Sequence, residues 1–216
     1  MRPLTAALTA AVAAFMAAFA VGTQRNIRKG NTALRWLQVA LPALGRRASL
    51  RWLGSSAVVV GISEPREPFA EVEAVVVLEP RDLVWLRAWG RSRGRRDFLI
   101  LRARLIRSPR FELEAGDLKG WTGHDGRPHL DTGTWQEADW GYPGVRIAHT
   151  SEADPEEGRR HWERLTAASG GVWRLSIRRT PPHLDIHVLF PNISEVGPEP
   201  LVGAFRDLGR SVIGPG

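Results

Sequence analysis

The chain has 216 residues, of which 43% are hydrophobic and 25% are charged. These proportions are typical of a folded protein and exclude a chain that is disordered throughout. The absence of cysteine excludes disulfide bonds, a thiolate nucleophile and cysteine-ligated zinc. The net charge of +7 raises the question of nucleic-acid binding, and the answer depends on where the charges lie.

The charge excess belongs to the N-terminal part of the chain. Residues 1–63 contain 8 of the 30 Lys and Arg residues and no acidic residue, and the first acidic residue is Glu64. Residues 64–216 carry the other 22 basic and all 23 acidic residues, which leaves them at −1. The sequence therefore favours anionic lipid head groups over nucleic acid as the partner.

Residues 3–22 form an apolar run at the start of the chain. About 20 apolar residues, at a rise of 1.5 Å each, cross a hydrocarbon core of ~30 Å as a helix. Cations that follow such a run are retained on the cytoplasmic side. We therefore expect a single-pass anchor in the cell membrane, with the N-terminus outside and the body in the cytoplasm. The cations expected to orient the anchor or bind lipid are Arg25, Arg28, Lys29, Arg35, Arg46, Arg47 and Arg51.

A cleaved signal peptide is the alternative interpretation of the same run. Ala18-Phe19-Ala20 matches a small-x-small cleavage pattern. The run is longer than the usual 7–15-residue signal core, and more positive charge follows it than precedes it. These features favour the anchor, while cleavage within residues 1–20 stays open.

The sequence predicts three segments. Residues 1–24 are the transmembrane anchor, residues 25–53 a basic juxtamembrane helix or linker, and residues 54–216 a cytoplasmic α+β domain. Leucines in residues 34–44 recur with helical spacing. This stripe predicts either a helix at the membrane surface or the first helix of the soluble core.

The domain is expected to combine antiparallel hairpins with about three helices. Alternating and β-branched runs predict strands at 57–61, 74–78 and 145–149. Helices are predicted at 81–94, 155–168 and 199–213. A first hairpin, 98–106 with 111–115, would pair Arg104 with Glu112 and Arg102 with Glu114. A second joins 172–178 to 183–190.

The order strand, helix, hairpin occurs twice, in residues 74–115 and 145–190. This predicts either a duplicated βαββ unit or an ordinary α+β layout without duplication. Residues 116–142 between the two hairpins are rich in Gly, Asp, Thr and Trp and read as a long loop.

The most specific local pattern is a strand that places His183, Asp185 and His187 on one face. Two imidazoles and a carboxylate suit zinc or another divalent metal ion. The alternative is a structural polar strand face, which neighbouring arginines favour because fixed cations repel a metal. The tetrapeptide Pro-His-Leu-Asp at residues 182–185 occurs again at residues 128–131 in the long loop, where it would add His129 and Asp131 as ligands.

A second candidate surface lies in residues 81–110, which contain ten arginines and two acidic residues. Arginines interleaved with tryptophans suit a membrane surface, a protein partner or single-stranded nucleic acid. Pairing with the acidic residues 111–157 would neutralise part of this charge. The cations expected to remain available to lipid or a partner are Arg91, Arg93, Arg95 and Arg96.

No motif in the sequence specifies a catalytic activity, and no cofactor is expected. The sequence favours a membrane-anchored binding or structural module over an enzyme. The alternatives are a metal-dependent hydrolase that uses His183, Asp185 and His187, and a nucleic-acid-binding module that uses residues 81–110. A protein partner is compatible with the prediction, and the oligomeric state is not determined by the sequence.

Overall fold

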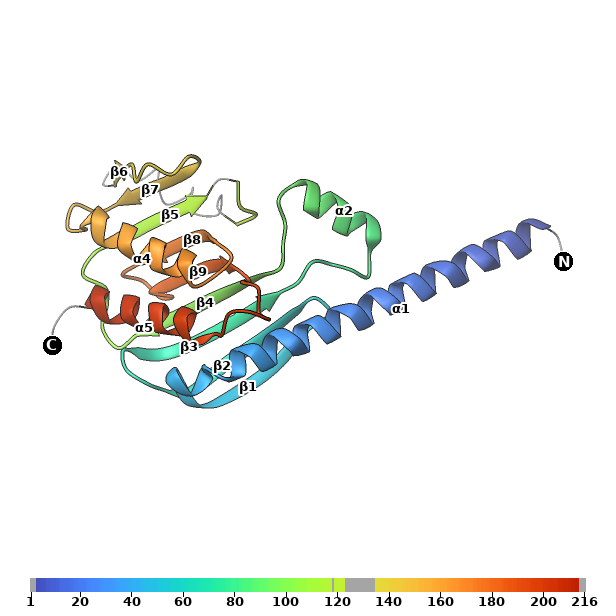
Figure 1. Cartoon of the computed structure of the whole chain (residues 1–216), viewed down its shortest axis with the longest axis horizontal. Coiled ribbons are helices and arrows are strands. Elements are labelled where there is room, and N and C mark those ends of the chain that lie inside the picture. Colours follow the sequence, from blue (N-terminus) through green and yellow to red (C-terminus); the bar gives the residue numbers. More distant parts are fainter. Residues whose placement is uncertain (1–2, 118, 123–134, 214–216) are drawn as a thin grey trace.

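The computed structural model describes residues 3–117, 119–122 and 135–213. Its described part combines four α-helices with a nine-stranded sheet in which every pair of neighbours is antiparallel (Figure 1). The predicted α+β class is therefore confirmed. The elements are α1 (Pro3–Gln38), a short 3-10 helix (Leu41–Ala43), β1 (Gly45–Leu53), β2 (Ala57–Pro65), β3 (Phe69–Val77), α2 (Val84–Ser92), β4 (Phe98–Leu105), β5 (Leu113–Asp117), β6 (Gln136–Ala138), β7 (Val145–His149), α4 (Pro155–Ala167), β8 (Val172–Ile177), β9 (Leu184–Leu189) and α5 (Glu199–Ile213).

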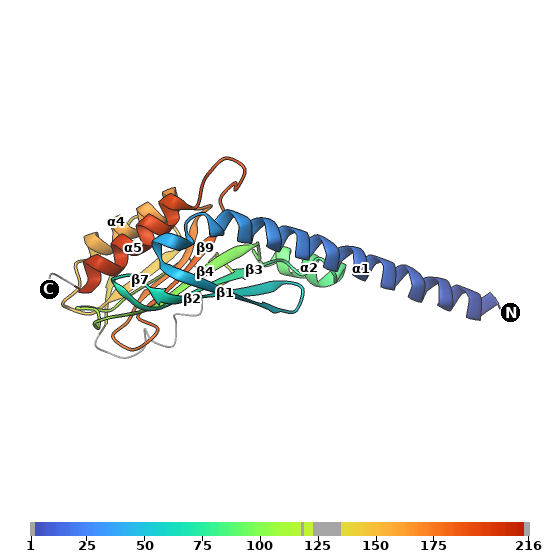
Figure 2. The same cartoon turned by 90° about the horizontal axis from the view of Figure 1, so that it is seen from below.

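The sheet has the strand order β1-β2-β3-β4-β9-β8-β5-β7-β6. The C-terminal half of α1, together with α4 and α5, lies on one face of it (Figure 2). Alternate residues of each strand point into this layer, so that Leu99 and Leu101 of β4 join the main core. The buried rings of Phe69 and Phe205 stack there with centroids 4.9 Å apart, which ties α5 to β3.

Helix α1 has two halves with different surroundings. Residues 3–21 are exposed and extend away from the body, whereas Ala33, Trp36 and Leu37 are buried in the main core. The helical stripe in residues 34–44 therefore belongs to the core, as the second of its two interpretations predicts. The helix passes from one half to the other without a break.

Residues 45–53 form the edge strand β1, although the sequence places them in a juxtamembrane segment before the sheet. Most side chains of β1 are exposed. Its sequence therefore lacks the alternation between apolar and polar residues that identifies a half-buried strand. The helix that precedes it also ends earlier than the stripe suggests, at Gln38.

The predicted hairpin between 98–106 and 111–115 is wrong. β4 pairs with β3 and β9, whereas β5 pairs with β7 and β8. Both strands do place alternate residues in the core, as predicted. Alternation determines which face a residue occupies, but many strands satisfy the same pattern, so it does not select the partner.

The second predicted hairpin is confirmed as β8 and β9. Leu175 pairs with Ile186, and Ile177 pairs with Leu184, in the expected register. A bulge near Trp173 makes Val172 the partner of Val188 instead. Trp173 consequently lies in a second, smaller apolar cluster with Phe98.

Of the two alternatives for the repeated order, the strand pairing supports the α+β layout without duplication. β3 and β4, which flank α2, are antiparallel neighbours. β7 and β8, which flank α4, are separated by β5. The two segments therefore form different supersecondary structures.

The three predicted helices are present, and α2 is shorter than expected. Helix α4 begins after Asp154, whose side chain accepts a hydrogen bond from the Glu156 amide at 2.9 Å.

Candidate functional site

The exposed half of α1 is an apolar surface about 28 Å long, since residues 3–21 rise 1.5 Å each. This is the one helix in the described part of the chain that is long and apolar enough to span a membrane. A signal sequence near the N-terminus has the same properties. Length and composition therefore support both of the interpretations reached from the sequence.

The close packing of α1 against the body begins at Gly22. A side chain at Gly22 would overlap the carbonyl oxygen of Arg81, and one at Gly30 would overlap the ring of Trp52. Between these glycines the buried Asn26 accepts a hydrogen bond from Arg81 at 3.1 Å. Small residues thus allow α1 to lie directly against the body one residue after the exposed half ends.

An ion-pair cluster holds this contact in place. Arg81 binds both carboxylate oxygens of Asp97, at 3.0 and 2.7 Å, and Lys29 of α1 pairs with the same carboxylate. Burial acts to raise the pKa of Asp97, but the hydrogen bonds from Arg81, Lys29 and the Glu79 amide outweigh it and lower the pKa. Asp97 is therefore ionised at neutral pH and links α1 to the segment around α2.

Helix α2 lies beside the exposed half of α1, beyond the end of the sheet (Figures 1 and 2). The rings of Phe15 and Trp85 stack with centroids 6.0 Å apart. The apolar side chains of α2 are nevertheless largely exposed: Val84 by 65%, Trp85 by 60% and Trp89 by 48%. The apolar surface of α1 therefore continues onto α2.

Arginines and a third tryptophan surround the C-terminal end of α2. Trp89 meets Trp121 edge to face at 6.3 Å. The guanidinium of Arg93 lies 4.4 Å from the Trp89 ring centroid, and that of Arg95 lies 5.5 Å from the Trp121 ring centroid. We call Val84, Trp85, Trp89 and Trp121 the aromatic end of the body.

The four arginines predicted as a partner or lipid surface are partly engaged within the protein. Arg91 pairs with the buried Glu79 at 3.2 Å, where Arg87 also binds at 2.9 Å. Arg96 donates to the backbone carbonyls of Arg91 and Arg95. Arg93 and Arg95 lie against the tryptophans of the aromatic end, and Arg91, Arg93 and Arg96 are exposed.

The structure separates the seven cations that follow the apolar run. Arg25, Arg28 and Lys29 lie on α1 within about 12 Å of residue 21, at 1.5 Å per residue. Arg35 is about 21 Å along the same helix, well beyond a Debye length of ~8 Å from the exposed apolar half. Arg46, Arg47 and Arg51 belong to β1, and the first two lie within 4 Å of Glu64.

His183, Asp185 and His187 are buried in the sheet and are engaged with protein groups. His183 Nδ1 accepts the Leu105 amide at 3.0 Å, and burial lowers the His183 pKa, so the ring is neutral. Asp185 accepts from Arg102 at 2.9 Å and lies 3.3 Å from His187 Nε2. Within the described ranges, no group of three His, Cys, Asp or Glu side chains is placed to hold a metal ion.

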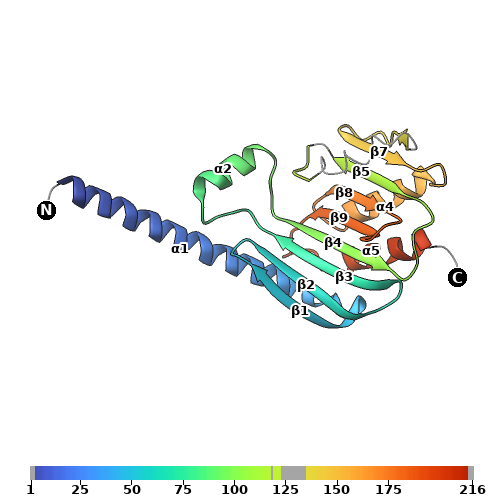
Figure 3. The same cartoon turned by 180° about the vertical axis from the view of Figure 1, so that it is seen from behind.

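Asp185 belongs to a series of alternating charges that crosses five adjacent strands, β3, β4, β9, β8 and β5 (Figure 3). Arg102 lies between Glu73 and Asp185, and Arg174 lies between Asp185 and Glu114. Glu114 also accepts Arg178 and Ser176, each at 2.6 Å. We call these residues the sheet-face charge network.

This network corrects the expected pairing of Arg102 and Arg104 with Glu114 and Glu112. Arg104 instead binds Glu71 of β3 at 2.7 Å, and Glu112 accepts the backbone amide of Arg179 at 3.0 Å. The arginines of residues 81–110 thus pair largely with acidic residues outside 111–157. The sequence shows the charges, but their partners depend on the strand order.

A pocket of about 630 Å³ opens on the charge network. Its lining residues are Glu71, Arg102, Arg104, Arg174, Arg178, Pro181, Pro182 and Asp185. Each of the four arginines has a carboxylate partner in the network or in Glu71. Burial acts to raise the pKa of Asp185, but bonds from His187 and Arg102 prevail and lower it to about 2. The pocket is therefore polar and permanently charged, with four arginines and two carboxylates in its lining.

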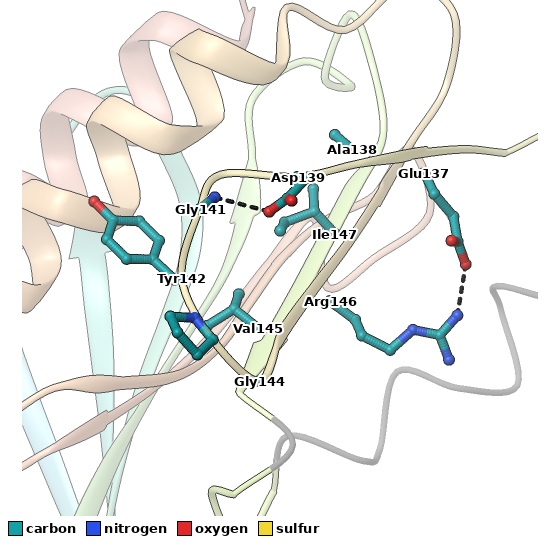
Figure 4. A pocket seen from close by; sticks show the side chains of 10 residues that line it. Glu137, Ala138, Asp139, Gly141, Tyr142, Gly144, Val145, Arg146 and Ile147 are labelled. Atoms are coloured by element: carbon teal, nitrogen blue, oxygen red, sulfur yellow. Dashed lines mark hydrogen bonds and ion pairs between the residues drawn. The ribbon is translucent and has the colours of Figure 1, made fainter.

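A second pocket, of about 440 Å³, lies at the β6–β7 hairpin (Figure 4). Its polar groups are paired with one another: the Gly141 amide donates to Asp139 at 2.8 Å, and Arg146 donates to Glu137 at 2.5 Å. The Tyr142 hydroxyl donates to Glu163 of α4 at 2.7 Å, which raises the Tyr142 pKa. These contacts fix the hairpin to α4 and leave a structural role for the pocket's side chains.

Two of the residues predicted as metal ligands, His129 and Asp131, lie outside the described residues. The contact between Phe15 and Trp85 was missed, because a pairing across 70 positions leaves no local pattern. Gly22, Asn26 and Gly30, spaced by four, did carry a signal: small and polar residues on one stripe of an otherwise apolar helix indicate a packed face.

Comparison with protein-family models and with curated proteins found no match to this chain.

Proposed function

We propose that the protein is a single-pass membrane protein whose α+β body is a binding or structural module held at the cytoplasmic surface of the bilayer. The observation that carries the proposal is that α1 continues without a break from an exposed apolar half into the core of the body. One end of this helix is buried, and the other exposes apolar side chains over about 28 Å. In water this exposure is unfavourable in free energy, whereas a bilayer would cover the apolar side chains.

The charges support this orientation. Arg25, Arg28 and Lys29 follow the apolar half directly, and no acidic residue precedes Glu64. By the positive-inside rule the body then lies in the cytoplasm and the N-terminus outside. Arg25 and Arg28 are exposed and near enough to contact anionic head groups, each contributing about 1 kcal/mol to binding.

The polar pocket on the sheet supports a binding role for the body. Among the described helices, α1, α4 and α5 lie on the opposite face, so the pocket is reached from solvent. Paired arginines and carboxylates suit the recognition of a polar partner, and among the described residues no group of three His, Cys, Asp or Glu side chains is placed to hold the metal ion of a hydrolase. The binding module is therefore the function that the site supports best.

Cysteine labelling of the full chain tests the proposal, because the natural chain has no cysteine and is its own background control. In membrane vesicles with the native outside surface facing out, Ser151→Cys should react with an impermeant maleimide only after lysis. The protein should also resist carbonate extraction and have the mass of the full chain. Reaction without lysis would place the body outside, and a soluble product that begins after Ala20 would identify a signal peptide.

A further inference from the structure

We propose that the aromatic end of the body, Val84, Trp85, Trp89 and Trp121, inserts into the membrane interface as a second lipid contact beside α1. This inference rests on the proposed function, because it requires α1 to span the bilayer. It adds a new surface and names its occupant, the boundary between acyl chains and head groups. The body would then lie against the bilayer at two places.

The first argument is continuity between the two apolar surfaces. Trp85 stacks on Phe15, which lies in the exposed half of α1, yet 60% of Trp85 is still exposed. A bilayer that surrounds Phe15 must therefore also meet Trp85. Val84 and Trp89 extend the same apolar surface along α2.

The second argument is depth. Phe15 lies six residues before the end of the exposed half at residue 21, or about 9 Å at 1.5 Å per residue. Amphipathic helices at membrane surfaces bury their apolar face by about 5–10 Å. The contact between Phe15 and Trp85 thus places α2 at the depth expected of an interfacial helix.

The third argument is composition. Tryptophan is enriched at the boundary between hydrocarbon and water, where its ring is apolar and its N–H is polar. The exposed Arg93 lies over the Trp89 ring and Arg95 lies over the Trp121 ring, and such cations suit anionic head groups. An aromatic patch bordered by arginines and adjoining a membrane span fits lipid better than a soluble partner.

Fluorescent probes on single cysteines test this insertion in the full chain reconstituted into vesicles of phosphatidylcholine and phosphatidylglycerol. Ala88→Cys, exposed on α2 between the two tryptophans, reports on the aromatic end. Ala11→Cys reports on the span, and Ser151→Cys reports on the body away from it. Lipids with nitroxide groups should quench the probes at positions 11 and 88 and not the probe at 151.

The outcomes separate the two proposals. Quenching at position 11 without quenching at 88 would overturn the interfacial contact and leave the anchor intact. No quenching at position 11 would overturn the anchor itself. A probe at 88 that neither nitroxide lipid nor aqueous iodide quenches would show that protein covers α2, which also overturns lipid as the occupant.

A paired variant shows whether the tryptophans cause the insertion. Trp85→Asp with Trp89→Asp should abolish quenching at position 88 and preserve it at position 11. Leu50→Asp on β1 is the matched control, because Leu50 is also an exposed apolar residue, at 52%. Unchanged quenching at 88 in the tryptophan variant would contradict the proposed contact.

Discussion

The guanidinium of Arg174 lies between two buried carboxylates, with Nε 3.5 Å from Glu114 and Nη1 3.7 Å from Asp185. It connects the two halves of the sheet-face charge network, since Glu114 belongs to β5 and Asp185 to β9. Arg174 itself is 7% exposed. The strand order of the sheet thus places a buried cation where two buried anions need one.

Replacing Arg174 should therefore destabilise the protein strongly. Arg174→Met keeps much of the side-chain volume but leaves Glu114 and Asp185 with one partner fewer. We expect a loss of about 3 kcal/mol in the free energy of unfolding, measured by chemical denaturation of the full chain in detergent. Arg104→Met, which removes an exposed ion pair on the same face, should change stability little. Equal effects of the two variants would contradict the role given to Arg174.

Asp97 should be required for the attachment of α1 to the body. Asp97→Asn leaves the cations of Arg81 and Lys29 without their carboxylate, and we expect a loss of about 3 kcal/mol in the free energy of unfolding. The same denaturation experiment measures it. The control is Asp207→Asn, since the ion pair of Asp207 with Arg210 is exposed. A stable Asn variant would show that packing alone holds α1.

Gly22 should not tolerate a side chain, although it lies on a helix. Gly22→Ala would bring a methyl group into the Arg81 carbonyl, and moving that backbone segment should cost about 1–3 kcal/mol. Gly203→Ala in α5 meets no atom within 4 Å, so it should be neutral or slightly stabilising. Thermal unfolding in detergent compares the two variants. A Gly22→Ala protein as stable as the natural chain would argue against close contact at this position.

Stability should fall as the pH drops from about 6.5 to about 4, because of His161. Burial, with repulsion from Arg164 and Arg160, lowers the His161 pKa from 6.5 to about 4. The unfolded chain then binds the proton more readily than the folded one over this range, so stability is full above pH 6.5 and decreases below it. The decrease can reach about 3 kcal/mol.

The variant His161→Gln isolates this effect. Glutamine can keep a hydrogen bond with Ser211, which lies 2.8 Å from His161 Nε2, but it does not titrate. Denaturation curves at several pH values should therefore be flatter for the variant than for the natural chain. Identical pH dependence in both proteins would assign the acid sensitivity to other groups.

Much of the secondary structure could be predicted from the sequence because its causes are local. The limits of α5 follow from an amphipathic repeat, and β7 and the β8–β9 hairpin follow from short alternating runs. Strand β1 could not be recognised, since its exposed side chains show no alternation. The partners of β4 and β5 required knowledge of the strand order, which no local pattern contains.

The candidate site shows the same division. The apolar run and the cations after it were visible in the sequence, as were the tryptophans of α2. Their relation was not, because Phe15 and Trp85 meet only when α1 and α2 are placed on the same body. Asp185 and His187 lie on β9, with His183 directly before it, and the neighbouring arginines already favoured a structural polar face. The binding of Asp185 by both Arg102 and Arg174 could not be predicted, because it depends on the strand order.

The unbroken course of α1 makes the angular position of the body depend on a single helical register. Each residue of an α-helix turns the chain by about 100°. One residue inserted before Gly22 would therefore swing the body about the axis of the span by more than a quarter turn and carry α2 to another side of it. The helix thus determines the orientation of the body about the axis of the span. A rotation of the span within the bilayer would rotate the sheet by the same angle.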